Sequence, residues 1–344
     1  MNVQISGGNI PPVNQLSVFG RARRLPRMWL LAVYLIIPIC MILMFADMFY
    51  FGKLFRKNWS NSSFGGQPWW LLLFGLPHLI AGNLTLLDKE YFSYYRTKLL
   101  PAFLAYGFLS FAAAFGPVWL SNSVVLVLSF YTIYHLLAQQ AGLCLTMLTC
   151  VGRSSKVWKN LMLACGMSLY LAVYLHLQWP QISVASYNPV AISIVIFSIL
   201  LCLLTYFTRK IQGTAADTVA LNYLWANVAM LFGLALAFTF GYFSIVFIIP
   251  RVIHDLTAYQ IYFNHDANRN AYSRHNILYA NRYLKHFPPS LTLTLASIFI
   301  AYLLQTYYHP LTVGLVFWLT FIHYYAEGII WRKPNLHRQH LLLS

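Results

Sequence analysis

The stretch that decides the fold is LTVGLVFWLTFIHYYAEGIIW, residues 311–331. Apart from its two tyrosines, its only ionisable side chains are those of His323 and Glu327. At a rise of about 1.5 Å per residue, such a segment extends roughly 30 Å as an α-helix, which is the thickness of the hydrocarbon core of a bilayer. The stretch therefore predicts a transmembrane helix with a histidine near its middle.

The composition of the whole chain favours the same class of protein. Of its 344 residues, 59% are hydrophobic and 9% are charged, whereas soluble domains have about 25% charged residues. Segments of this kind span a bilayer as helices rather than as barrel strands. The net charge of +16 comes without a nucleic-acid-binding motif, so we exclude nucleic acid as a partner.

The apolar segments predict an all-α, polytopic helical bundle with about ten transmembrane helices and both termini in the cytoplasm. A cytoplasmic segment, 1–28, precedes a single transmembrane domain, 29–331, and a cytoplasmic tail, 332–344, follows it. Within the domain, 264–288 is predicted to be a cytoplasmic interfacial segment with a short amphipathic helix. The predicted spans are 29–50, 68–87, 99–120, 123–150, 160–178, 189–208, 219–240, 242–263, 290–307 and 311–331.

The positive charges set the predicted orientation. Nineteen of the 23 Lys and Arg residues fall in segments assigned to the cytoplasm, three fall in the outer loop at 53–57, and Arg251 lies inside a span. Cytoplasmic loops of membrane proteins carry such an excess of positive charge. Compact loops and unpaired cysteines favour a bacterial inner membrane as the location.

Four histidines lie at matching depth in this topology. His78, His135, His254 and His323 each follow the outer end of their span by 10–12 residues, which places them roughly 15–18 Å deep. Ionisable residues at this depth are costly and usually functional. Neutral imidazole is the commonest protein metal ligand, and four of them suit Fe, Cu or Zn. The pattern predicts one shared metal site, most consistent with Fe(II); a structural polar network and a proton or substrate path are the alternatives.

Two polar residues lie one helical turn beyond predicted ligands. Glu327 follows His323 by four residues, and Gln139 follows His135 by four. Residues at this spacing share a helix face, and metal-bound histidines usually donate their second N–H to a carboxylate or an amide. Glu327 and Gln139 are therefore predicted to support the ligands or to transfer protons, and Glu327 could instead be a fifth ligand.

The segment around His254 adds further candidates. Asp255 follows it directly and points about 100° away, and it is predicted to support the site or to transfer a proton. Arg251 precedes Asp255 by four residues and is expected to pair with it, with anion or substrate contact as the alternative. His265 and Asp266 repeat the His-Asp pair 11 residues later. They lie too far along a continuing helix, about 16 Å, to share the metal.

The remaining polar histidines of the loops are expected to be solvated. They fall in segments assigned to the cytoplasm and are His275, His286, His337 and His340.

Two short motifs carry a resemblance to a known family. GLPH at 75–78 and YHLLAQQ at 134–140 are similar to segments of the membrane carotene dioxygenases of the Brp/Blh family. That resemblance implies a polytopic protein with one non-haem iron, bound by His78, His135 and His254.

The chain departs from that family at two positions. The family has a further histidine four residues after the third ligand, where this chain has Ala258. His323 would have to replace it from another span. The family also has glycine after its first histidine, where this chain has Leu79.

Three functions are compatible with these features. The first is an integral membrane metalloenzyme, a non-haem oxygenase that oxidises or cleaves a lipid-soluble small molecule with O₂ while surrounded by membrane lipids. The second is a haem-binding electron-transfer subunit, with two histidines as axial ligands. The third is a transporter with an intramembrane relay of His, Asp, Arg and Glu side chains.

Overall fold

The computed structural model of the chain describes residues 23–59, 75–148, 152–178, 188–213, 217–270, 276–281, 287–307, 309–332 and 335–344. Within these ranges the regular structure is helical, apart from two isolated β-bridges, Leu25 with Leu343 and Asp88 with Asn276. The predicted all-α class is therefore confirmed.

Most of the long helices begin and end within a few residues of the predicted spans, whereas α7 begins ten residues before its predicted span. In chain order they are α2 (Arg27–Ala32), η1 (Val33–Leu35), α3 (Ile36–Phe49), α4 (Leu54–Trp59), α6 (Leu76–Thr85), α7 (Lys89–Phe115), α8 (Val118–Met147), α9 (Arg153–Gln178), α10 (Pro189–Gln212), α11 (Thr218–Thr239), α12 (Phe243–Arg269), α13 (Ile277–Ala280), α14 (Pro289–Thr306), α15 (Pro310–Ile330) and α16 (Leu336–Gln339).

Eight helical segments of the described chain are long and apolar enough to cross a membrane. They are the segment Arg27–Phe49 and the helices α7, α8, α9, α10, α11, α14 and α15. Helix α12 is not among them, and its sequence includes two aspartates and two arginines. Helix α6 has ten residues and follows a stretch outside the described ranges. The chain is thus a membrane-spanning helical protein, while the total of ten spans stays a prediction.

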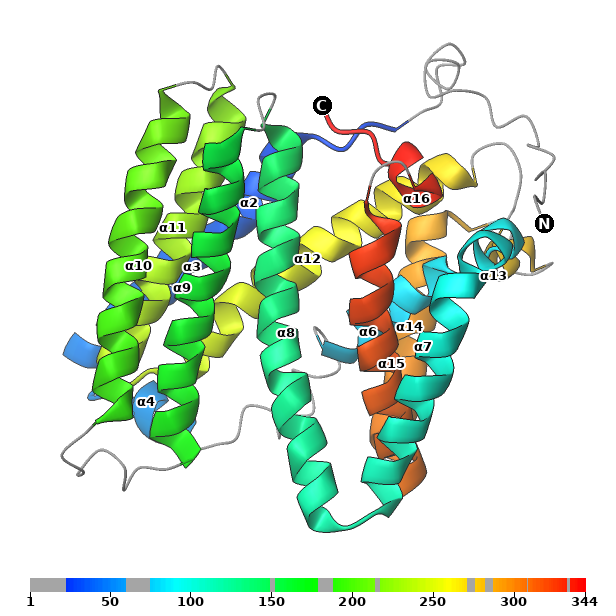
Figure 1. Cartoon of the computed structure of the whole chain (residues 1–344), viewed down its shortest axis with the longest axis horizontal. Coiled ribbons are helices and arrows are strands. Elements are labelled where there is room, and N and C mark those ends of the chain that lie inside the picture. The colour runs from blue at the N-terminus through cyan, green and yellow to red at the C-terminus, as the bar shows by residue number, and fades with distance from the viewer. Residues whose placement is uncertain are drawn as a thin grey trace.

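The four helices that carry the predicted ligands contact one another. Helix α12 runs obliquely across the molecule, with α9, α10 and α11 on one side and α6, α7, α14 and α15 on the other (Figure 1). Helix α6 packs against both α12 and α15, and α8 packs against the same two helices. This arrangement brings α6, α8, α12 and α15 together around one buried region.

A proline lies inside α12, one turn before His254. Pro250 has no N–H, so the carbonyl of Val246 cannot make its usual hydrogen bond within the helix. The hydroxyl of Tyr170 on α9 donates to this carbonyl at 2.8 Å. A neighbouring helix therefore satisfies the group that the proline leaves unpaired, and α12 continues through the site.

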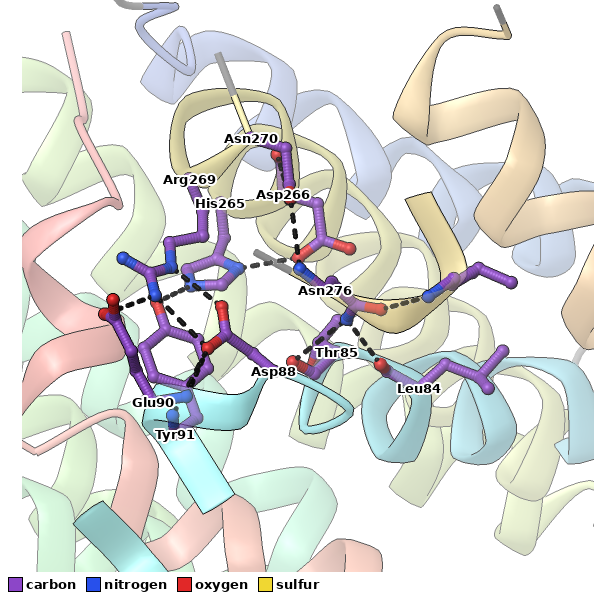
Figure 2. Close-up of polar contacts among 11 residues, drawn as sticks. Leu84, Thr85, Asp88, Glu90, Tyr91, His265, Asp266, Arg269, Asn270 and Asn276 are labelled. Carbon is purple, nitrogen blue, oxygen red and sulfur yellow. Dashed lines mark hydrogen bonds and ion pairs between the residues drawn. The ribbon is translucent and has the colours of Figure 1, made fainter. Parts of the chain in front are cut away.

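A polar clamp ties the turn between α6 and α7 to the far end of α12 (Figure 2). Arg269 donates to both carboxylate oxygens of Asp88, at 2.9 and 3.2 Å, and to Glu90 at 2.7 Å. Asn276 donates to the carbonyl of Leu84, in the last turn of α6. Burial alone would raise the pKa of Asp88, but the bonds from Arg269 and from backbone N–H groups hold it below 3.8.

Helix α12 extends past residue 263, the predicted end of its span. It continues to Arg269, and Asn264 to Asp266 are buried, while the assignment of 264–288 to the cytoplasmic interface stays a prediction. Their polar groups have partners inside the protein, such as the backbone of Arg23, which accepts from Asn264 at 2.9 Å. The rest of the segment contains α13, and residues 271–275 and 282–286 lie outside the described ranges.

Candidate metal centre

Three imidazole nitrogens meet between α6, α12 and α15. Nε2 of His78 lies 3.1 Å from Nε2 of His323 and 3.1 Å from Nε2 of His254. The ring of His78 stands nearly perpendicular to those of His323 and His254, at 88° and 90°, with centroids 4.8 Å apart in each pair. All three side chains are buried, so the nitrogens point into the protein and toward a common position.

The spacing of these nitrogens fits ligands of one metal ion. Two nitrogens bound at about 2.1 Å and separated by 90–110° at the metal lie roughly 3.0–3.4 Å apart. Nε2 of His78 lies 3.1 Å from the Nε2 atom of each of its two neighbours. Within the described residues, His78, His254 and His323 form a group that could hold a metal ion.

The neighbours of His78 favour the tautomer that binds metal through Nε2. Its Nδ1 lies 3.1 Å from the carbonyl oxygen of Gly75 and 3.1 Å from Oδ1 of Asp255. Both neighbours are acceptors, so the proton resides on Nδ1 and the lone pair on Nε2 is available. Asp255 is itself held by Nε of Arg251, which donates to Oδ2 at 3.0 Å.

A second group of possible ligands shares His323 with the first. His135, His323 and Glu327 are buried, and each offers a ligand atom within 4.8 Å of the others. Nε2 of His135 lies 3.2 Å from Oε2 of Glu327. The ring of His135 also stacks on Tyr324, with centroids 4.3 Å apart and an angle of 28°. The described residues thus gather four imidazoles and one carboxylate in a single buried region, which we call the metal centre.

Two donors hold the carboxylate of Glu327 in place. The hydroxyl of Tyr262 donates to its Oε1, and so does the indole N–H of Trp331 at 3.2 Å. The other oxygen, Oε2, faces His135. Charge-assisted hydrogen bonds of this kind are about twice as strong as neutral ones, so they fix the carboxylate beside the imidazoles.

Gly82 makes room for the ring of His323. It follows His78 by one turn on α6, and a Cβ atom built there would lie 2.5 Å from Nδ1 and 2.7 Å from Cε1 of His323. The same Cβ would lie 2.8 Å from the hydroxyl of Tyr262. Any larger residue at this position would push the imidazole out of place.

The structure places the two other predicted supporting residues differently. Asp255 pairs with Arg251, as expected, and lies 4.0 Å from Nε2 of His254 but 3.1 Å from Nδ1 of His78 on the neighbouring helix α6. Oε1 of Gln139 accepts a hydrogen bond from Gln140 at 3.3 Å. The described contacts of Gln139 therefore do not include the metal centre, although the role predicted for it there stays a prediction.

A second group of histidines lies near the end of α12, and we call it the tail cluster: His265, His337 and His340. His265 bonds through Nδ1 to Asp266 at 2.7 Å and through Nε2 to the hydroxyl of Tyr91 at 2.9 Å. His337 stacks on His265, with centroids 4.8 Å apart and planes 7° apart. The expectation that the tail histidines are solvated is wrong, because His337 and His340 are buried.

The C-terminal segment folds back over the molecule and buries these histidines. Backbone N–H groups of Leu25 and Arg27 donate to the carbonyls of Leu342 and Ser344. The amide of Asn268 on α12 donates to the carbonyl of His340 at 2.9 Å. Of the other loop histidines predicted to be solvated, His275 and His286 lie outside the described ranges.

Comparison with protein-family models, with curated proteins and with solved structures found no match. The class of protein therefore follows from the fold and the site. It is a membrane-spanning helical protein with a buried cluster of histidine and glutamate side chains that could hold a metal ion.

Proposed function

We propose that this protein is an integral membrane metalloenzyme that holds non-haem Fe(II) at the metal centre and uses O₂ to oxidise or cleave a lipid-soluble substrate. The observation that carries this proposal is the meeting of three buried imidazoles, in which Nε2 of His78 lies 3.1 Å from Nε2 of both His254 and His323. His78, His135, His254 and His323 would bind the ion.

The donor set favours a redox-active transition metal. Imidazole ligands suit Zn, Cu and Fe, and a combination of histidines with one carboxylate is the ligand type of non-haem Fe(II) oxygenases. Glu327 supplies that carboxylate next to His135. Calcium and magnesium prefer oxygen ligands, so a centre dominated by imidazole argues against them.

The packing of the rings argues against haem. Axial histidines bind a haem from opposite faces, and the porphyrin needs a clear plane between them. Here His78 and His323 face each other directly at 3.1 Å. His135 lies beside both His254 and His323, with centroids 4.9 and 5.3 Å away. Four rings this close leave no such plane.

The surrounding residues would organise the reaction. When bound, iron would supply the activation of O₂. Asp255 keeps the proton of His78 on Nδ1, and the hydroxyl of Tyr262 donates to Glu327, which places an exchangeable proton beside the ligands. Burial of all these groups excludes bulk water, which limits side reactions of oxidising intermediates. A substrate that dissolves in the bilayer can approach such a site without crossing water.

The test is O₂ consumption by protein in lipid nanodiscs. Protein loaded with Fe(II) and supplied with a membrane lipid extract should consume O₂, and protein loaded with Zn(II) should not, because zinc fills the same site without redox chemistry. The His135→Ala variant should lose the Fe(II)-dependent rate. Equal O₂ consumption by the Fe(II) and Zn(II) forms would contradict the proposed function.

A further inference from the structure

Arg251 brings a guanidinium to the edge of the metal centre. It precedes His254 on α12 by three residues, less than one turn. A guanidinium has five N–H donors. The described residues supply two partners for them, the carboxylate of Asp255 at 3.0 Å and the hydroxyl of Tyr324. The side chain is 16% exposed, so donors remain for a further acceptor.

The charges of the centre do not balance when a divalent ion is bound. The carboxylates of Asp255 and Glu327 cancel the two charges of the ion, and the four imidazoles bind in their neutral form. Arg251, although it is paired with Asp255, then leaves the loaded centre with one net positive charge among the described residues. An unpaired charge in a medium of low dielectric constant is costly, so the loaded centre favours a ligand that carries one negative charge.

The shape of the donor group narrows the class of anion. The planar guanidinium can donate two parallel hydrogen bonds to the two oxygen atoms of a carboxylate, and a spherical anion cannot accept them in this way. Tyr324 packs in an apolar cluster with Leu79 and Ile80, and with the half-buried Tyr131. Apolar side chains therefore lie next to the tyrosine that contacts Arg251, and they match the chemistry of an aliphatic chain.

Resting on the proposed function, we propose that the substrate is a lipophilic monocarboxylate, such as a fatty acid, whose carboxylate lies between Arg251 and the metal. Arg251 would then determine specificity, because a neutral lipid of the same shape leaves the charge of the loaded centre unbalanced. This narrows the substrate class from any lipid-soluble molecule to those with one acidic head group.

The experiment is a titration of protein loaded with Co(II), whose visible spectrum reports changes in the ligand sphere. Dodecanoate should shift the spectrum with a saturable dependence on concentration. Dodecanol, which has the same chain without the charge, should bind at least about tenfold more weakly. Acetate, which has the charge without the chain, should also bind at least about tenfold more weakly.

Two variants and one control separate the role of the charge from effects on folding. All are saturated with Co(II) before titration, so that a change in metal affinity does not affect the result. Arg251→Gln should weaken dodecanoate binding by at least about tenfold. Arg251→Lys keeps the charge but loses the planar group, so its affinity for dodecanoate should lie between those of Arg251→Gln and the wild type. Arg209→Gln removes an exposed arginine on α10 and should change nothing.

The outcomes distinguish this inference from the proposed function. If the wild-type protein binds one Co(II) but dodecanoate leaves the spectrum unchanged, or binds equally well to Arg251→Gln, the carboxylate inference is overturned and the metal centre stands. Equal affinity for acetate and dodecanoate would overturn the lipid part of the inference. If the wild-type protein binds no metal, the proposed function itself fails.

Discussion

The molecule contains two buried groups of histidines that differ in how their nitrogens are used. In the metal centre, Nε2 of His78 lies 3.1 Å from Nε2 of His254 and 3.1 Å from Nε2 of His323. In the tail cluster, His265 has both nitrogens occupied by Asp266 and Tyr91, and His337 stacks on it face to face. Burial and proximity are common to both groups, but only in the first do the lone pairs converge.

This difference separates a group that could share one metal ion from a group that could not. Stacked rings direct their nitrogens sideways, so one ion cannot reach both, whereas perpendicular rings can direct them to one position. Within the described residues, His78, His254 and His323 meet the geometric requirement for a shared ion, and the tail cluster does not. Metal binding should therefore follow the direction of the ring nitrogens.

The largest expected effect is the loss of a ligand. His323→Ala should lower metal affinity by more than about 100-fold, because it removes the residue that both groups of possible ligands share and structural metal ions owe their affinity to a few such bonds. His337→Ala, in the tail cluster, should leave metal content unchanged. Elemental analysis of both purified variants checks this, and equal metal content would refute the contrast between the two groups.

Loss of a supporting carboxylate should have a smaller effect. Asp255→Asn keeps the size of the side chain but removes the charge that faces Nδ1 of His78 at 3.1 Å. Partners of this kind typically change metal affinity by about 10–100-fold. Asp266→Asn makes the same change beside His265 and serves as the matched control. Competition with a chelator measures both affinities, and a similar loss in the control would mean that the effect is general.

An added methyl group should disturb the site by steric overlap. In Gly82→Ala the new Cβ would lie 2.5 Å from Nδ1 of His323, and overpacking of this kind costs about 1–3 kcal/mol. We expect metal affinity to fall about tenfold. Gly328→Ala, on α15 next to Glu327, meets nothing within 4 Å and is the control. Retention of full affinity by Gly82→Ala would show that His323 is not fixed where the structure places it.

The smallest expected effect concerns the pH dependence of stability. Burial, with help from His265, His340 and Arg269, holds the pKa of His337 well below 6.5. The unfolded chain then binds a proton at His337 that the folded protein excludes, so this histidine lowers stability as pH falls below 6.5. His337→Phe should remove that pH dependence. It should also raise the free energy of unfolding by about 1 kcal/mol, because both ring nitrogens of His337 are buried without hydrogen-bond partners among the described residues.

Thermal unfolding in detergent between pH 5 and pH 8 measures this prediction. The melting temperature of the wild type should fall more steeply on the acid side than that of His337→Phe. Parallel curves would show that His337 does not titrate in this range.

Much of the metal centre could be predicted because the depth of a residue in a membrane span follows from its position along the sequence. Counting residues from the predicted outer ends placed His78, His135, His254 and His323 at one level, and the structure brings them together. The same reasoning placed Glu327 one turn from His323. Periodicity along a helix is encoded locally, so these relations could be inferred from the sequence.

What the sequence could not provide were contacts across helices. The neighbour of Asp255 is His78 on α6, and nothing in the sequence of α12 indicates which helix crosses it. The burial of His337 depends on a tail that folds back over α12. Gly82 was missed, although a glycine one turn after a predicted ligand is a signal of close approach by another helix.

The most direct test of the central claim is X-ray absorption spectroscopy at the metal edge of purified protein. One ion per chain, with scattering from at least three imidazole ligands that is lost in His323→Ala, is the result that this account predicts. An absence of stoichiometric metal, or an ion whose ligand sphere is the same in the wild type and in His323→Ala, would contradict it.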